Sequence, residues 1–231
     1  MQAQWPARVL LLRWTIVTTE PEPRDPGQPV GDVDWDERYA EQVWSGDPNQ
    51  ALVREASGLT PGRALDVGCG EGADAVWLAR QGWRVTALDV AAAALARGRA
   101  AAEAIGVEVT WLHSGLLEAD LPLGAFDLVT AQYPALRRTP GDDAEHRLVD
   151  LVAPGGTLLV VHHDVSDPSH ALAHGFDPAD WVGPRDVAAH LGAGWRVDVD
   201  EVRERRVTGG AGAHHTHDVV VRATREAPAV G

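Results

Sequence analysis

Three glycines at alternate positions form the part of the sequence best suited to binding a ligand. Gly68, Gly70 and Gly72 follow a short apolar run containing the acid Asp66, and a helical pattern begins shortly after them. Glycine adopts positive φ angles readily and lets a ligand lie directly against the backbone. The pattern therefore predicts a strand, a tight binding loop and a helix, in that order.

The acid beside this loop indicates the charge of the ligand. Gly68, Gly70 and Ala73 also fit the dinucleotide pattern G-x-G-x-x-(G/A), so the glycines alone leave an NAD-dependent oxidoreductase open. A carboxylate at Asp66 would repel a pyrophosphate and attract an ammonium or sulfonium group, so we expect a cationic ligand. Cys69, the only cysteine, is interpreted as a small residue filling the loop rather than as a nucleophile.

Four segments resemble motifs of the class I S-adenosylmethionine-dependent methyltransferases. Residues 65–72 resemble the glycine-rich first motif, and residues 84–89 resemble the second strand, whose terminal acid binds the ribose hydroxyls. Residues 126–130 resemble the fourth strand, and residues 151–160 resemble the helix, turn and fifth strand. In order and spacing the resemblance covers about residues 35 to 225.

The resemblance implies a fold, a cofactor and a reaction. The fold is an α/β, doubly wound, Rossmann-like sheet of about seven mostly parallel strands, with an antiparallel hairpin at its edge and helices on both faces. The cofactor is S-adenosyl-L-methionine, and the reaction is transfer of its methyl group by in-line displacement to a small molecule. Residues 35–39 and 44–46 look most similar to the small bacterial tellurite-resistance and thiopurine methyltransferases.

The same resemblance implies which residues bind the cofactor. Asp89 binds the ribose or caps the helix that follows, and the two roles can coexist. Gly115 stands where relatives commonly carry an acid that accepts a hydrogen bond from the adenine amino group, so we expect weaker adenine contacts. Tyr39 and Trp44 either cover the sulfonium or are ordinary core aromatics. The full predicted set is Tyr39, Trp44, Asp66, Gly68, Cys69, Gly70, Gly72, Asp89, Val90, Gly115, Leu116 and Gln132.

The ends of the fourth and fifth strands hold the side chains expected to act on the acceptor. Methyl transfer mainly requires alignment of the two reactants, and it needs a base only when the nucleophile starts protonated. His162 and His163 end the fifth strand, and histidine is partly neutral near physiological pH. Tyr133 follows the fourth strand. We predict these three as catalytic residues; the alternative for the histidines is a structural hydrogen bond.

The remaining features limit the domain organisation. Residues 9–17 are apolar but too short for a membrane span, and a proline-rich stretch follows, so residues 1–33 are interpreted as an N-terminal extension. The methyltransferase domain with its N-terminal capping helices is predicted over residues 34–231. His214, His215 and His217 are closely spaced, but no fourth ligand is evident, so we expect no metal.

Composition limits the partners. A formal net charge of -14 disfavours nucleic acid as a substrate, and a single cysteine suits a reducing cytoplasm. We expect a cytoplasmic monomer or homodimer that acts on a small molecule without a membrane. Three functions stay open: a small-molecule methyltransferase, an NAD-dependent oxidoreductase, and a non-catalytic partner subunit that binds S-adenosylmethionine.

Overall fold

The computed structural model describes residues 35–39, 46–169, 172, 177–205 and 216–227 of the 231-residue chain. The predicted extension, Trp44, His214 and His215 therefore lie outside the described residues. Of the helices within these ranges, none combines the length and the apolar character needed to cross a membrane.

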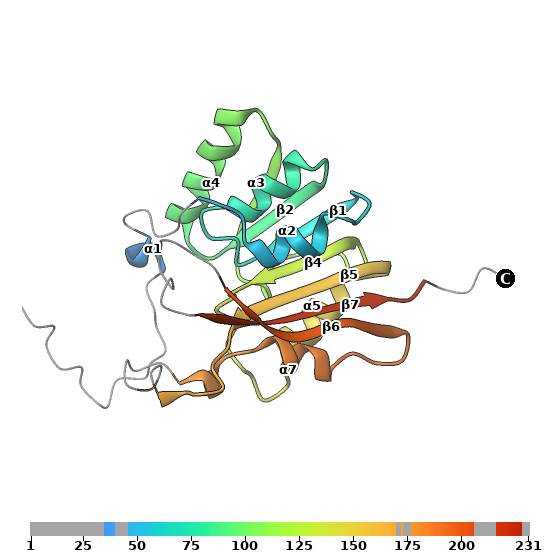
Figure 1. The fold of residues 1–231 in the computed structure, drawn as a ribbon. Coiled ribbons are helices and arrows are strands. Elements are labelled where there is room, and N and C mark those ends of the chain that lie inside the picture. Colours follow the sequence, from blue (N-terminus) through green and yellow to red (C-terminus); the bar gives the residue numbers. More distant parts are fainter. Residues whose placement is uncertain (1–34, 40–45, 170–171, 173–176, 206–215, 228–231) are drawn as a thin grey trace, which may run out of the picture. The chain divides into compact units, whose positions relative to one another are not determined.

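One sheet of seven strands organises the described residues (Figure 1). Its order is β3-β2-β1-β4-β5-β7-β6. The first five strands run parallel to one another, and β7 runs antiparallel to both of its neighbours, β5 and β6. This confirms the predicted doubly wound fold with an antiparallel edge hairpin. The strands are β1 (Arg63–Val67), β2 (Arg84–Asp89), β3 (Val109–His113), β4 (Phe126–Gln132), β5 (Val152–His163), β6 (Trp195–Glu204) and β7 (His217–Arg225).

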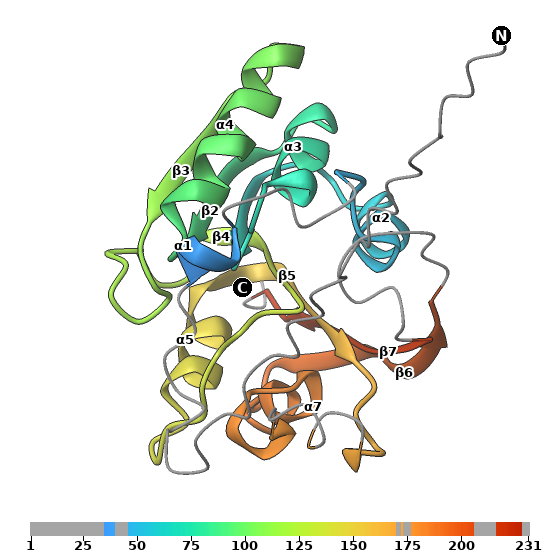
Figure 2. The ribbon, with the colours of Figure 1, turned by 90° about the vertical axis from the view of Figure 1, so that its left-hand side faces the viewer.

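Helices cover both faces of the sheet, as the two views show (Figures 1 and 2). The helices α2, α3 and α4 lie on one face, and α5 and α7 lie on the other. Their bounds are α1 (Trp35–Arg38), α2 (Gln50–Ala56), α3 (Ala73–Arg80), α4 (Ala92–Ile105), α5 (Asp143–Leu151) and α7 (Pro184–Ala189), with a 3-10 turn η1 (Pro178–Asp180).

The central strands bury both faces, because alternate side chains enter two separate cores. Val129 and Leu158 pack in the core under α5 and α7, whereas Leu128 and Leu159 pack in the core under α2 and α3. This is why these strands read as continuous apolar runs rather than as alternating patterns. The strand order reverses between β1 and β4, and in doubly wound sheets ligands bind at such a switch point.

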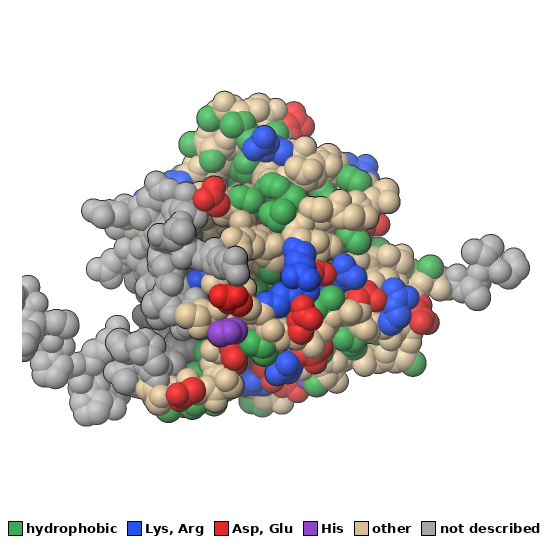
Figure 3. All heavy atoms as spheres, viewed as in Figure 1, with side chains coloured by type: hydrophobic (Ala, Val, Ile, Leu, Met, Phe, Trp, Pro, Cys, Tyr) green, Lys and Arg blue, Asp and Glu red, His purple; other side chains and the backbone are tan. Residues whose placement is uncertain are grey.

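The edge strand β6 is protected by charge. Its outward side chains carry both signs, with Arg196 bonded to Asp198 at 2.7 Å and Arg203 bonded to Glu201. Figure 3 shows arginine and acidic side chains interspersed over this part of the surface. Charged side chains of this kind discourage an exposed edge from pairing with another chain.

One element boundary differs from the resemblance of residues 151–160 to a helix, a turn and a strand. The strand β5 begins at Val152, directly after α5, so the expected turn is part of an irregular strand whose register shifts against β4. The helix α7 ends at Ala189, and the strand β6 extends to Glu204, where its pairing with β7 reaches His217.

Candidate functional site

The glycine loop after β1 is fastened to the end of β2. Gly68, Gly70 and Gly72 have φ angles of 68°, 51° and 79°, so all three lie in the left-handed region that favours glycine. The amides of Gly68 and Cys69 donate to the Leu88 carbonyl at 2.9 and 3.0 Å. The loop therefore has one fixed conformation beside the carboxyl end of β2.

Gly72 has a packing role that the sequence analysis did not predict. A Cβ built at this position would overlap the Trp111 indole of β3 and would lie 3.2 Å from Gly98 Cα in α4. Trp111 fills the space between the loop and α4 only because both neighbours are glycine. This third glycine of the motif is therefore required by the core, whether or not it also approaches a ligand.

Asp89 joins the glycine loop to the start of α4. Its Oδ2 accepts the Gly70 amide and its Oδ1 accepts the Ala91 amide, both at 2.8 Å. Burial raises the pKa of the Asp89 carboxyl, and the amide hydrogen bonds oppose that shift. Asp89 thus stabilises the turn before α4, but it does not cap the helix, because the N-cap residue is Ala91 and, within the part of the chain that the structure describes, Asp89 accepts no hydrogen bond from the first turn.

Two further acids lie beneath the loop. Asp66 is fully buried, and its Oδ2 has no hydrogen-bond partner among the described residues. Asp74, in the first turn of α3, accepts bonds from the backbone and side-chain nitrogens of Asn49, both at 2.7 Å. Burial raises the pKa of Asp66 well above its usual value, and the charges of Asp74 and Asp89 raise it further.

This arrangement fits a cationic ligand. An acid whose pKa is raised by two neighbouring acids releases its proton more readily when a positive charge binds nearby. A buried carboxylate oxygen without a protein partner can accept a hydrogen bond from a ligand or from water. Asp74 also belongs to this group of acids, and Asn49 is its hydrogen-bond partner. The sequence does not reveal either residue, because the hydrogen bonds join segments that are distant in the chain.

The other predicted cofactor residues differ in exposure. Val90 is 48% exposed beside Gly115, whereas Leu116 is buried in the core with 3% exposure. Tyr39 is buried against Ala91 and Ala94 at the start of α4.

Gln132 is buried at the end of β4, where its Nε2 donates to Thr130 Oγ1 at 2.8 Å. The side chains of Leu116 and Gln132 therefore pack within the protein. The prediction that Gln132 contacts the cofactor through its backbone stays a prediction.

A second cluster lies at the ends of β4, β5 and β7. The Tyr133 hydroxyl donates to Asp218 Oδ2 at 2.7 Å, and His163 Nδ1 lies 3.2 Å from Asp218 Oδ1. The Tyr133 and His163 rings are 4.4 Å apart between centroids. The Arg205 guanidinium lies 5.1 Å from the Tyr133 ring centroid, and its Nε is 3.7 Å from Asp218 Oδ2.

The contacts of Asp218 bear on the roles of its two partners. The Tyr133 hydroxyl donates to the carboxylate, and in the His163 tautomer that carries its proton on Nδ1 this nitrogen also donates to Asp218, which leaves Nε2 as the basic nitrogen. Burial and the Asp218 charge raise the pKa of the Tyr133 phenol, so the hydroxyl stays protonated.

His162 does not share this arrangement. Successive residues of a strand point to opposite faces, and the His162 and His163 ring centroids are 5.7 Å apart. Burial, then the neighbouring His163, lower the pKa of His162 to about 4, which makes it a neutral imidazole at physiological pH. Of the three predicted catalytic residues, Tyr133 and His163 thus both contact Asp218. His162 lies next to the His163 ring.

Asp218 and Arg205 are the members of this cluster that sequence reasoning missed. Asp218 stands opposite His163 in the antiparallel register of β5 and β7, a pairing between residues 55 positions apart. One signal is present in the sequence: an acid opens an otherwise apolar run of valines, and in the structure it is only 6% exposed. Charged residues are seldom buried without a partner.

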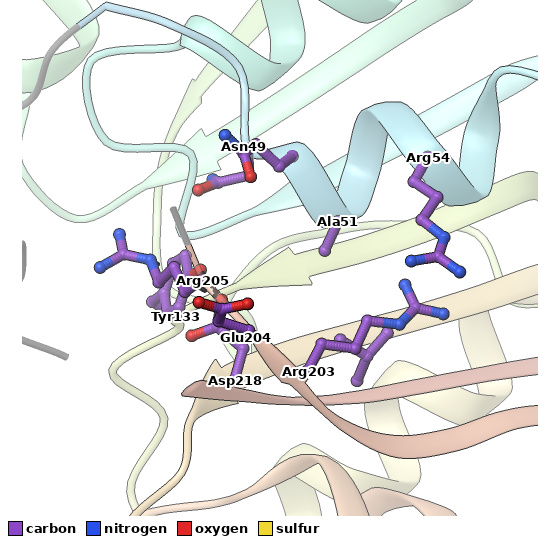
Figure 4. A pocket seen from close by; sticks show the side chains of 10 residues that line it. Asn49, Ala51, Arg54, Tyr133, Arg203, Glu204, Arg205 and Asp218 are labelled. Carbon is purple, nitrogen blue, oxygen red and sulfur yellow. Dashed lines mark hydrogen bonds and ion pairs between the residues drawn. The ribbon is translucent and has the colours of Figure 1, made fainter. Parts of the chain in front are cut away.

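A pocket of about 100 Å³ lies beside the second cluster. It lies between the start of α2 and the ends of β6 and β7, and Figure 4 shows its labelled side chains. Asn49, which binds Asp74, lines one side, and Tyr133 and Asp218 line another. The arginines Arg54, Arg203 and Arg205 also line this pocket, in which both signs of charge are present.

Known proteins resemble the chain in sequence. A family model described as a methyltransferase domain matches residues 64–156. An uncharacterized methyltransferase of Mycobacterium bovis is 40% identical over 97 residues, which are 42% of this chain and 48% of that protein. The chain thus matches about half the length of that relative. A ubiquinone biosynthesis O-methyltransferase of Erwinia tasmaniensis is 30% identical over 170 residues, 68% of each protein.

Solved structures share the fold. The N-methyltransferase NodS from Bradyrhizobium japonicum, solved with S-adenosyl-L-homocysteine, aligns with a TM-score of 0.62 and 20% identity over 82% of this chain and 95% of that one. Together with the Erwinia relative and the matched motifs, this identifies the chain as a member of the class I S-adenosylmethionine-dependent methyltransferases. The likeness to the tellurite-resistance branch stays a prediction.

Proposed function

We propose that the protein transfers the methyl group of S-adenosyl-L-methionine to a small-molecule acceptor. The observation that carries this proposal is that His163 and Tyr133 both contact Asp218, beside a pocket whose lining also includes Asn49, the hydrogen-bond partner of Asp74. One group of residues suits a cationic donor, and the other suits a nucleophile that must lose a proton.

The donor residues fit the cofactor by charge and by backbone shape. Asp66, Asp89 and the loop from Gly68 to Gly72 would hold it, with Val90, Gly115, Leu116, Tyr39 and the Gln132 backbone around them. When bound, S-adenosylmethionine supplies an electrophilic methyl group on a positively charged sulfur. Three buried or nearly buried acids, Asp66, Asp74 and Asp89, give the surroundings the opposite charge.

On the acceptor side, His163 acts as the general base. Asp218 orients its ring through Nδ1 and stabilises the imidazolium that forms when Nε2 takes a proton. Tyr133 stays protonated and holds the second oxygen of Asp218, so the carboxylate keeps one orientation. His162, neutral and partly buried, supports the neighbouring ring rather than exchanging protons at physiological pH.

Two facts favour a small molecule as the acceptor. The formal charge of -14 disfavours nucleic acid, and the Erwinia relative is named for ubiquinone biosynthesis. Family membership favours this function over the NAD-dependent oxidoreductase. Cytoplasmic location and a monomeric or dimeric state stay predictions.

The first experiment measures donor binding by calorimetry. Wild-type protein should bind S-adenosylhomocysteine with a micromolar dissociation constant, and Asp89→Ala should lose that binding. Glu103→Ala, which removes an exposed acid from α4, is the matched control and should bind like wild type. A wild-type protein that does not bind S-adenosylhomocysteine but binds NAD would overturn the proposal.

The second experiment measures turnover. A panel of oxygen, nitrogen and sulfur nucleophiles and tellurium or selenium oxyanions is incubated with S-adenosylmethionine, and S-adenosylhomocysteine is quantified. Formation of product with at least one acceptor, abolished in His163→Gln, supports the enzyme. Donor binding without turnover on any acceptor would instead support the non-catalytic partner subunit.

A further inference from the structure

The pocket beside the second cluster has two sides that differ in charge. On the arginine side, the guanidinium groups of Arg54 and Arg203 point toward one another (Figure 4). On the acid side lie Glu204 and Asp218, next to Tyr133 (Figure 4). Because a few placed charged groups fix the orientation of a bound molecule, this pocket should hold its ligand one way round.

A buried acid of α2 holds the arginine side in place. Glu55 is 6% exposed, and its Oε1 lies 2.7 Å from Arg203 Nη1. Its Oε2 lies 3.0 Å from Arg222 Nη1, and Arg203 Nε is bonded to Glu201. The Arg203 side chain is only 14% exposed, so these contacts fix its guanidinium at the wall of the pocket.

Arg54 adds a second positive charge to the arginine side. Its Nε lies 3.8 Å from Oε1 of Glu55, the oxygen closest to Arg203, and this separation is too long for a hydrogen bond. Within the part of the chain that the structure describes, Arg54 pairs with no other acid. Its side chain is 69% exposed and can therefore turn toward a ligand in the pocket that it lines.

The ion pairs around Glu55 leave one positive charge in excess. Among the described residues these pairs join four arginines to three acids, namely Arg54, Arg196, Arg203 and Arg222 with Glu55, Asp198 and Glu201. Two guanidinium groups that face one another repel, and an anion between them would be attracted by both. One excess charge matches a carboxylate, whereas a phosphate monoester carries about two negative charges near neutral pH.

The acid side of the pocket suits the reacting atom rather than an anion. Arg205 also lines the pocket, but its Nε lies 3.7 Å from Asp218 and its guanidinium lies over the Tyr133 ring. Asp218 in turn lies 3.2 Å from Nδ1 of His163, the proposed base. Together with Glu204, Asp218 would repel a carboxylate on this side, so the negative group of a ligand belongs on the arginine side.

We propose that the methyl acceptor is a small carboxylic acid, bound with its carboxylate between Arg54 and Arg203 and with its nucleophilic atom toward Tyr133 and Asp218. The inference rests on the proposed function, because it takes His163 as the base. A guanidinium donates to both oxygens of a carboxylate at once, so the arginines recognise the planar shape of the group as well as its charge.

The reaction leaves this carboxylate unchanged. The nucleophilic atom of the acceptor gives its proton to His163 Nε2 and forms a bond to the methyl carbon. The electron pair of the broken carbon–sulfur bond stays on the sulfur of S-adenosylhomocysteine. The carboxylate therefore serves only to bind and orient the acceptor, and replacing it should affect affinity first.

The test compares three acids with their own amides by calorimetry, in protein saturated with S-adenosylhomocysteine. The acids are para-hydroxybenzoate, para-aminobenzoate and para-mercaptobenzoate, which hold an oxygen, nitrogen or sulfur nucleophile opposite the carboxylate. Wild-type protein should bind at least one acid about ten-fold more tightly than its amide, the effect of one hydrogen bond between charged groups. Arg54→Gln should bind that acid and its amide with equal affinity.

Two further variants control for charge. Arg54→Lys keeps the positive charge but loses the planar fork, so it should keep part of the preference for the acid. Arg185→Gln removes an exposed arginine from α7, on the opposite face of the sheet, and should keep all of it. Because the Arg54 side chain is largely exposed, its replacement should leave the melting temperature close to that of wild type.

A wild-type protein that binds S-adenosylhomocysteine but prefers none of the acids to its amide would overturn this inference and leave the proposed function intact. An unchanged preference in Arg54→Gln would overturn it as well, because the carboxylate would then bind elsewhere. Failure of wild type to bind S-adenosylhomocysteine would overturn the proposed function and this inference together.

Discussion

The donor and acceptor halves of the site are built in different ways. On the donor side, the glycine loop and Asp89 lie within 24 residues of one another in the sequence, from Asp66 to Asp89, and their contacts are largely backbone amides. On the acceptor side, Tyr133, His163, Arg205 and Asp218 come from four separate segments and meet through their side chains.

This difference explains what each half can tolerate. A site made of backbone amides depends on φ angles and close packing, so substitutions there should act on folding and on donor affinity. A site made of side chains on a completed sheet can be altered without changing the strands that carry it. Each variant below tests that separation.

The largest effect should come from Asp218→Asn. The amide lacks the negative charge and one of the two acceptor oxygens, so it cannot accept from both Tyr133 and His163 or stabilise an imidazolium, and turnover of an acceptor found in the screen should fall about 100-fold. Calorimetric affinity for S-adenosylhomocysteine should stay unchanged. Asp200→Asn, which alters an exposed acid of β6 bonded to Arg185 at 2.8 Å, should match wild type in both assays. A comparable loss of donor affinity in Asp218→Asn would show that the halves are not separable.

Next in size is Gly72→Ala on the donor side. Positive φ and overlap with Trp111 should together lower the free energy of unfolding by roughly 2 to 4 kcal/mol, measured by urea denaturation. Gly106→Ala isolates the backbone contribution, because Gly106 has a φ of 71° and a Cβ added there would have no other atom within 4 Å. That control should cost about 1 kcal/mol. Equal losses in the two variants would contradict the packing role of Gly72.

A smaller effect concerns pH and His162. Its pKa is about 4 in the folded protein against 6.5 for the free side chain, so the unfolded chain binds the proton first as the pH falls. Stability should therefore decrease between pH 6.5 and pH 4, by about 2 kcal/mol from this group. Melting temperatures of wild type and His162→Gln over this range give the difference. A difference that does not depend on pH would show that His162 has an ordinary pKa.

The smallest effect should be that of Tyr133→Phe. The variant keeps the ring beside His163 and Arg205 but loses the hydrogen bond to Asp218, so stability should fall by about 1 kcal/mol. Donor affinity should not change. A lower affinity for S-adenosylhomocysteine would mean that Tyr133 also contributes to donor binding, which would contradict the separation of the two halves.

The residues of the proposed donor half can be selected from the sequence because their signals are contiguous. The loop glycines, Asp66 and Asp89 stand at fixed spacing along one βαβ unit, and the strand order confirms the predicted sheet. Asp218 could not be assigned, because its role depends on the register of β7 against β5.

The position of β7 in the sheet has a consequence for synthesis of the chain. This strand follows β6 in sequence, yet it lies between β5 and β6, and it brings Asp218 to His163. A nascent chain emerging from the ribosome can assemble the strands of the donor half early. The contact between His163 and Asp218 forms only when this last strand is inserted, so on the proposed function donor binding should precede turnover during biogenesis.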